Sequence, residues 1–188
     1  MHSELNLSTP TSDRLAAWRL FFECAYVLID ILDAELQERA GISLRWYDVL
    51  VHLEEAPDGR LRMNDLARQI LSSKSGLTRV VDRMEHAGLV RRERPVSDRR
   101  VVEVVATPKG LDVLHAARPL HRDGLQRHFA RHLDDQDVKA LARALRKVRV
   151  DVRPLRAAQI GGSQGTNGPD EVADVALAEN HSLENPAS

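Results

Sequence analysis

Residues 72–100 decide the fold of this chain, and they read SSKSGLTRVVDRMEHAGLVRRERPVSDRR. A helical pattern follows the serine pair and ends at Gly88, since glycine favours the position after a last helical turn. At about 100° per residue, one side of this helix is apolar: Leu77, Val80, Val81, Met84 and Ala87. The opposite side is polar: Ser75, Arg79, Asp82 and His86, with Thr78 and Arg83 on the flanks. The pattern predicts a helix that packs by one face and presents the other outward.

The period of the sequence changes after this helix. Residues 89–94 and 101–106 alternate or are β-branched, and the segment between them contains Arg99 and Arg100. This predicts a β-hairpin with a basic tip. We expect the acids of this region, Asp98, Glu93 and Asp82, to pair with neighbouring arginines, because unpaired they would repel phosphate.

Spacing and capping residues predict the elements before this stretch. Apolar residues recur every three to four positions over 13–39, which predicts a helix that ends at Gly41. Ser43 is expected to cap the next helix and Asn64 a short one, with a turn at 56–59 between them.

Two helices are predicted after the hairpin. A Thr-Pro pair at 107–108 opens a long helix that continues to residue 133 and bends at Pro119. Asp134 and Asp137 open the last helix, which is expected to end by Pro154. The fold class is therefore mainly α with a small β-hairpin wing, a winged helix-turn-helix joined to a helical dimerisation region.

The first helix is apolar on nearly all sides. A helix of that kind must be buried on most of its surface, and in so small a chain a second subunit is the expected cover. It is not a transmembrane helix, because its most apolar stretch, residues 15–36, carries five charges: Arg19, Glu23, Asp30, Asp33 and Glu35.

Composition and charge limit the classes of protein that remain. The chain has 188 residues and one cysteine, so no internal disulfide and no cysteine-rich zinc site is expected. Residues 60–109 hold twelve bases and six acids, which favours a polyanionic partner, while residues 157–188 hold five acids and no lysine or arginine. We expect 157–188 to be a disordered acidic tail, residues 1–12 a flexible lead-in, and the protein to be cytoplasmic, because no signal segment precedes it.

The sequence resembles the MarR family of bacterial transcription regulators. The resemblance spans roughly residues 13–153, and the following segments carry it: 64–67 (NDLA), 76–84 (GLTRVVDRM), 88–92 (GLVRR), 97–100 (SDRR) and 106–110 (ATPKG). It implies an obligate homodimer, a pseudo-palindromic DNA operator, release of the DNA by a small molecule, and entry of Arg99 into a minor groove. The expected division is one MarR-type domain over 13–156, with dimerisation helices in 13–42 and 108–156 and the winged helix-turn-helix in 43–107.

A helix with this outer face suits the DNA major groove, and basic side chains on a wing suit a narrow minor groove. The predicted DNA contacts are Ser72, Ser73, Lys74, Ser75, Thr78, Arg79, Arg83, Arg99 and Arg100. The expected function is therefore a ligand-responsive DNA-binding regulator, with repression favoured and activation left as the alternative. The alternatives are a winged-helix module that binds another protein, and an enzyme. No phosphate loop, nucleophile elbow or His-Glu-x-x-His motif supports an enzyme, and no cofactor is expected.

Six of the seven aromatic residues lie between positions 18 and 47. They either fill a dimer core or wall a pocket for an aromatic or purine-like effector. The candidate effector residues are Trp18, Trp46, Tyr47, Asp48, His52 and Arg94. Trp18, Asp48 and either Arg83 or Arg94 loosely resemble the pattern of the urate-responsive branch of the family.

Cys24 and a set of three histidines each have two interpretations, one as a sensor and one as ordinary structural residues. Cys24 is either a redox sensor or, as favoured, an inert core residue. His121, His128 and His132 share one predicted helix, but neighbouring arginines would repel a cation, so a solvated face is favoured over a metal site.

Overall fold

The computed structural model describes residues 9–70, 74–95 and 101–162, and side-chain statements end at residue 150. Within those ranges the chain is mainly helical with one small antiparallel sheet, which confirms the predicted fold class. In chain order the elements are α1 (Ser12–Ala40), α2 (Leu44–Glu55), the 3-10 turn η1 (Pro57–Gly59), β1 (Arg60–Arg62), α3 (Met63–Gln69), α4 (Lys74–His86), β2 (Val90–Glu93), β3 (Glu103–Ala106), α5 (Pro108–His128), the 3-10 turn η2 (Ala130–His132) and α6 (Asp135–Gly162). None of the helices in the described part of the chain is long and apolar enough to cross a membrane.

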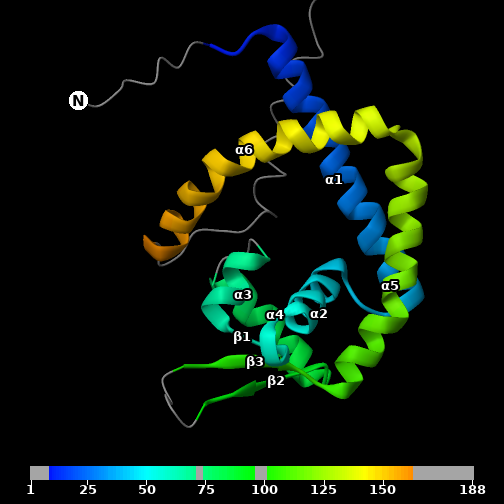
Figure 1. Ribbon diagram of the computed structural model, residues 1–188. Helices are drawn as coiled ribbons and strands as arrows, with labels where there is room; N and C mark the ends of the chain where they lie inside the picture. Colours follow the sequence, from blue (N-terminus) through cyan, green and yellow to red (C-terminus); the bar gives the residue numbers. More distant parts are fainter. Residues whose placement is uncertain (1–8, 71–73, 96–100, 163–188) are drawn as a thin grey trace, which may run out of the picture.

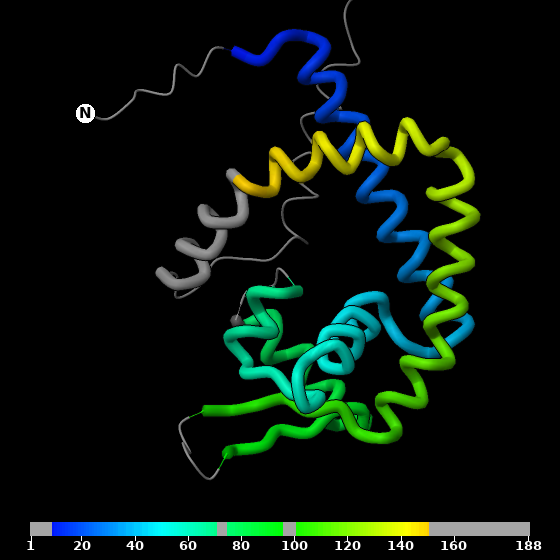
Figure 2. Tube along the Cα trace, in the orientation of Figure 1, coloured from blue at the N-terminus to red at the C-terminus, as the bar shows by residue number. Residues whose placement is uncertain are grey.

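Helices α2, α3 and α4 pack with the sheet into a lobe at one end of the molecule (Figure 1). The strand order is β1-β3-β2, and both pairings are antiparallel. The core of the lobe consists of side chains that exclude water almost completely, among them Leu50, Leu53, Leu66, Leu77, Val81, Met84, Val90 and Val104. The Cα trace in Figure 2 shows α5 running from this lobe to the region of α1 and the first turns of α6.

The helix limits near capping residues agree with the sequence predictions. Gly41 ends α1 with a left-handed backbone (φ 68°), and the Ser43 hydroxyl accepts a hydrogen bond from the Trp46 amide. The Thr107 hydroxyl accepts from the Gly110 amide at the start of α5. Asp134 accepts from two amides at the start of α6, as a capping residue does.

Three predicted element limits are wrong, and strand β1 was not expected. Asn64 does not cap α3, because β1 leads directly into the helix and the Met63 amide donates to the Val102 carbonyl. The helix expected to reach residue 133 ends at His128 and is followed by η2.

Helix α6 continues through Pro154 to Gly162, so the predicted end by Pro154 is wrong and residues 157–162 are helical. Proline removes one hydrogen bond, but strong helix formers follow it in the sequence LRAAQ at 155–159. The rest of the predicted tail, and the lead-in up to residue 8, lie outside the described residues.

Helix α1 lies beside α5 and buries only Leu32 and Leu36. Much of the remaining apolar surface of α1 and α6 stays exposed in the single chain: Leu15, Trp18, Leu20, Phe21, Tyr26, Val27, Ile29, Val138, Leu145, Val148 and Val150. Cys24 is exposed as well, so the prediction that it is buried in the core fails within one chain. An exposed apolar area of this kind on two helices marks an interaction surface.

Candidate nucleic-acid interface

Helix α4 has the two faces that the sequence predicts. Leu77, Val80, Val81 and Met84 are buried in the lobe. Six residues of the helix are exposed: Ser75, Thr78, Arg79, Asp82, Arg83 and His86. Of the other predicted contacts, Lys74 starts α4 but its side chain is not described, and Ser72, Ser73, Arg99 and Arg100 lie outside the described residues.

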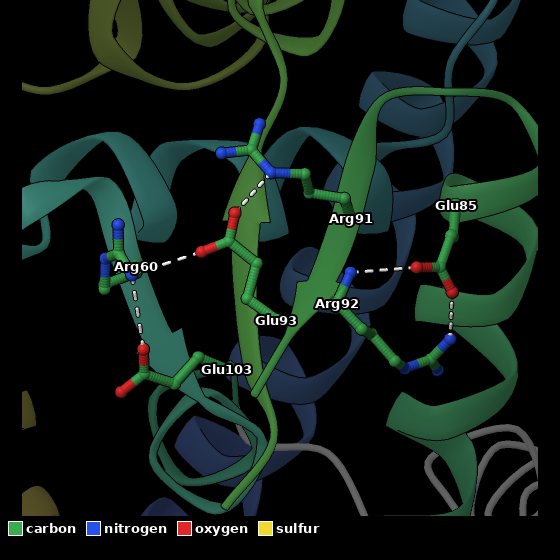
Figure 3. Close-up of polar contacts among 6 residues, drawn as sticks. All are labelled: Arg60, Glu85, Arg91, Arg92, Glu93 and Glu103. Atoms are coloured by element: carbon green, nitrogen blue, oxygen red, sulfur yellow. Dashed lines mark hydrogen bonds and ion pairs between the residues drawn. The ribbon is translucent and has the colours of Figure 1, made fainter. Parts of the chain in front are cut away.

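Arg92 of β2 fixes the sheet to α4 through a network of charged hydrogen bonds. One guanidinium nitrogen, Nη2, donates to Asp82 Oδ1 at 2.6 Å, and Nη1 donates to Glu85 Oε2. The backbone amide of Arg92 donates to the other oxygen of Glu85 at 2.8 Å (Figure 3). Because charge-assisted bonds to a partly buried arginine are strong, this network sets the position of α4 relative to the hairpin.

A second charged network joins side chains of all three strands, β1, β2 and β3. Glu93 Oε1 accepts from Arg91 Nε at 2.5 Å, and Glu93 Oε2 accepts from Arg60 Nη1 at 3.2 Å (Figure 3). Arg60 also lies 3.6 Å from Glu103 Oε2. The hydrogen bond from Arg91, with the charge of Arg60 beside it, lowers the pKa of Glu93. The expectation that Glu93 and Asp82 pair with arginines is confirmed, while Asp98 lies outside the described residues.

The turn between α4 and β2 is anchored to the start of α5. The Thr107 hydroxyl donates to the Gly88 carbonyl at 2.7 Å, and the Thr107 amide donates to the Leu89 carbonyl at 3.0 Å. Lys109 Nζ donates to the Ala87 carbonyl at 2.8 Å. The end of α4 therefore moves together with the first turn of α5.

The predicted effector residues are only partly brought together. On α2, Tyr47 is buried with its ring 4.5 Å from the ring of His121 of α5. Trp46 and His52 of the same helix are partly buried, and Asp48 is exposed.

The other two candidates lie elsewhere. Trp18 is exposed and its ring lies about 6 Å from those of Phe21 and Phe22. Helix α1 meets the start of α2 at Asp33, whose carboxylate accepts from the Leu44 amide, and at about 1.5 Å per residue Trp18 lies about 22 Å along the helix from that point. Arg94 is exposed just beyond β2. Trp18 therefore does not share a site with Asp48 within one chain.

Three residues where α2 contacts α5 have shifted pKa values. Desolvation raises the pKa of Asp48, although positive charge on His52 and His121 opposes this. Desolvation also raises the pKa of Tyr47 and lowers that of His121. Shifted pKa values gather at functional sites, so the contact between α2 and α5 is a candidate site for a polar molecule.

The sequence reasoning missed two carboxylates that tie α5 to its neighbours. Glu54 of α2 accepts from His115 at 2.7 Å and from Arg118. Glu35 of α1 accepts from His128 at 2.8 Å and from Arg127 at 2.7 Å. The signal that could have found them is the repeat of a histidine and an arginine within one turn of α5.

The three histidines considered for a metal site are engaged separately. His121 faces Tyr47, His128 binds Glu35, and His132 lies 3.2 Å from Arg131. No group of three or more metal-ligand side chains is found in the described ranges.

A family model described as the MarR family matches residues 40–101, which include β1, α3, α4 and β2. AbsC, a MarR family transcriptional regulator from Streptomyces coelicolor, is 36% identical, with a TM-score of 0.73 over 78% of this chain and 99% of its own. This chain belongs to the MarR family of transcriptional regulators.

Other solved structures of transcriptional regulators are also similar. Sco3205 from the same organism, solved in complex with DNA, is 35% identical, with a TM-score of 0.72 over 75% of this chain and 88% of its own. The transcriptional regulator BldR from Sulfolobus solfataricus is 28% identical, with a TM-score of 0.63 over 72% of this chain and 94% of its own. No curated protein matches this chain.

Proposed function

We propose that this MarR chain is a homodimeric DNA-binding repressor that reads a pseudo-palindromic operator with α4 and a minor groove with Arg99. The observation that carries the proposal is the exposed face of α4, on which Thr78, Arg79 and Arg83 lie opposite the buried apolar face. Its relative Sco3205 was crystallised in complex with DNA, which supports the same partner here.

The DNA contacts are proposed to divide into two kinds. Lys74 and Ser75 begin α4, and these two, with Ser72 and Ser73 before them in the sequence, are proposed to contact phosphates, because the first amides of a helix attract anions. Thr78, Arg79 and Arg83 suit base edges in the major groove, and Arg99 and Arg100 suit the minor groove.

The dimer is proposed to form through residues 13–42 and 108–156. Exposed apolar side chains on α1 and α6, such as Ile29 and Val148, support this surface because water would otherwise cover them. Two recognition helices in such a dimer must lie about 34 Å apart to enter successive major grooves.

A small polar, aromatic effector is proposed to bind beside Trp46, Tyr47, Asp48 and His52. This region lies where α5 meets α2, so an occupant can change the distance between the two α4 helices of a dimer. To change DNA occupancy from 99:1 to 1:99, effectors must favour the released form by about 5.5 kcal/mol, which two sites can share.

The test is fluorescence anisotropy of duplexes from the DNA upstream of the gene, at two salt concentrations. We expect tight binding that weakens steeply with salt, and a loss of about 1–3 kcal/mol for Arg99→Ala. Arg122→Ala, a change on an exposed position of α5, is the matched control. Binding that is weak, insensitive to salt and equal for both variants would favour the alternative of a protein-binding winged helix.

A further inference from the structure

The guanidinium group of Arg92 donates its hydrogen bonds to groups of one helix, α4. Nη1 binds Glu85, and Nη2 binds Asp82 and approaches the Thr78 carbonyl at 3.4 Å. These three partners lie four and three residues apart, so they follow one side of α4 over two turns. The Arg92 side chain connects β2 to α4. Because this side chain is only 24% exposed, it presents little of its guanidinium group to solvent.

Among the exposed residues of α4 within 74–84, Asp82 is the one carboxylate. Its side chain is 56% exposed. An unpaired carboxylate at this place repels DNA phosphates that come within the Debye length, about 8 Å at physiological salt. Arg92 neutralises Asp82 and at the same time holds Glu85 against the strand.

We infer that Arg92 is a positioning residue for DNA binding, which acts by neutralising Asp82 and fixing α4 to the hairpin and makes no phosphate contact of its own. The inference rests on the proposed function, since it explains why the negative charge of Asp82 on α4 does not oppose DNA binding. Its neighbour Arg91 differs: its side chain is 51% exposed and it binds Glu93 on the other side of the strand (Figure 3).

The experiment is a double-mutant cycle of Arg92→Met and Asp82→Asn in the full chain. The probes are a labelled duplex from the upstream DNA and a random-sequence duplex of equal length, so a charge effect is measured even without an operator. Thermal unfolding followed by circular dichroism verifies that each variant is folded. If Arg92→Met does not fold, Arg92→Lys replaces it, because lysine keeps the charge but cannot span both carboxylates.

We expect Arg92→Met to weaken binding about tenfold, and Asp82→Asn to recover about threefold or more of that loss while changing the wild type by less than about twofold. In the matched control background Arg91→Met, Asp82→Asn should act as it does in the wild type. The salt slope should change by clearly less than the step of about one that loss of a phosphate contact gives.

Two results would overturn the inference. One is an equal effect of Asp82→Asn in both the wild type and the Arg92 variant, because no coupling then exists. The other is a salt slope that drops by about one in Arg92→Met with no recovery in the double variant, since Arg92 would then contact phosphate itself. A wild-type chain that binds neither duplex would refute the proposed function, and this inference with it.

Discussion

Replacement of Gly110 by alanine should destabilise the protein strongly, although alanine is the better helix former. A Cβ atom at this position would lie 2.1 Å from the Leu89 carbonyl oxygen and 3.2 Å from Leu50 Cδ2. Carbon–oxygen contacts in proteins settle at about 3.3 Å, so the first turn of α5 must move away by about 1 Å. The atom that it meets belongs to the backbone and cannot rotate away.

The size of the effect follows from what this movement disturbs. The Thr107 amide donates to the Leu89 carbonyl at 3.0 Å, and the Thr107 hydroxyl, which donates to the Gly88 carbonyl, lies 3.1 Å from the same Leu89 oxygen. Overpacking costs about 1–3 kcal/mol, each weakened hydrogen bond about 1 kcal/mol, and alanine returns about 1 kcal/mol of helix propensity. We expect a net loss of about 3 kcal/mol in the free energy of unfolding, which for a chain of this size lowers Tm by about 6–12 °C.

The measurement is thermal and urea unfolding followed by circular dichroism, at one protein concentration because the stability of a dimer depends on it. Gly124→Ala is the matched control. Its Cβ would meet Leu32 Cδ2 at 2.7 Å and Glu35 Oε2 at 2.9 Å, which are ends of flexible side chains, so we expect a change within about 1 kcal/mol. A Gly110→Ala protein that unfolds at or above the wild-type temperature would refute the close approach of α5 to the Leu89 carbonyl.

Three further predictions concern the dimer surface and the charges around α5. Ile29→Glu combined with Val148→Glu should convert the dimer into monomers in light scattering, whereas Gln69→Glu, at an exposed position of α3 outside the proposed dimer region, should not; a dimer that persists would show that these faces are not the interface. The pKa values of Glu35 and Glu54 lie below the ordinary 4.5, because hydrogen bonds from His128 and Arg127, and from Arg118 and His115, favour the ionised form. The stabilisation by these two carboxylates is complete above pH 4.5 and is lost as pH falls through their lowered pKa values. Tm should therefore drop on acidification below about pH 4.5, and it should drop less in the Glu35→Gln/Glu54→Gln variant. An equal change of Tm with pH in the variant and the wild type would contradict this. The pKa of Asp48 is raised above the ordinary 3.8 by desolvation, so its ionisation costs stability as pH rises, and Asp48→Asn should raise Tm at neutral pH; a lower Tm would mean that the carboxylate is stabilised by a partner.

The features that could be predicted from the sequence depend on residues close together in the chain. Ser43, Thr107 and Asp134 cap helices through amides two or three residues away, so their roles are visible in a short window. The two faces of α4 follow from helical periodicity alone, and both are found as predicted.

The features that could not be predicted depend on residues far apart in the chain. β1 has only three residues, and its partner β3 lies more than forty residues later. The partners of Glu54 and Glu35 on α5 are separated from them by more than sixty and ninety residues. Pro154 misled the prediction for another reason: proline lowers helix stability locally, but its effect depends on the residues that follow it.

These long-range contacts determine which parts of the chain can move as units. The α4–β2 turn is bound to the start of α5 by Thr107 and Lys109, and Arg92 binds β2 back to α4, so the proposed DNA-reading elements form one body with the first turns of α5. Glu54 extends that body to α2 through Arg118. A ligand between α2 and α5 therefore cannot move α4 alone.

Helix α5 packs along α1 as well. There Glu35 binds Arg127 and His128, and Gly124 allows the close approach of Leu32. Because α1 also carries the exposed apolar surface proposed for the dimer, a change in the crossing of α1 and α5 would alter the distance between the two lobes of the proposed dimer. We expect an effector at Tyr47 and His121, within one turn of α5 from Gly124, to rotate α5 slightly and so to move both α4 helices out of register with successive major grooves.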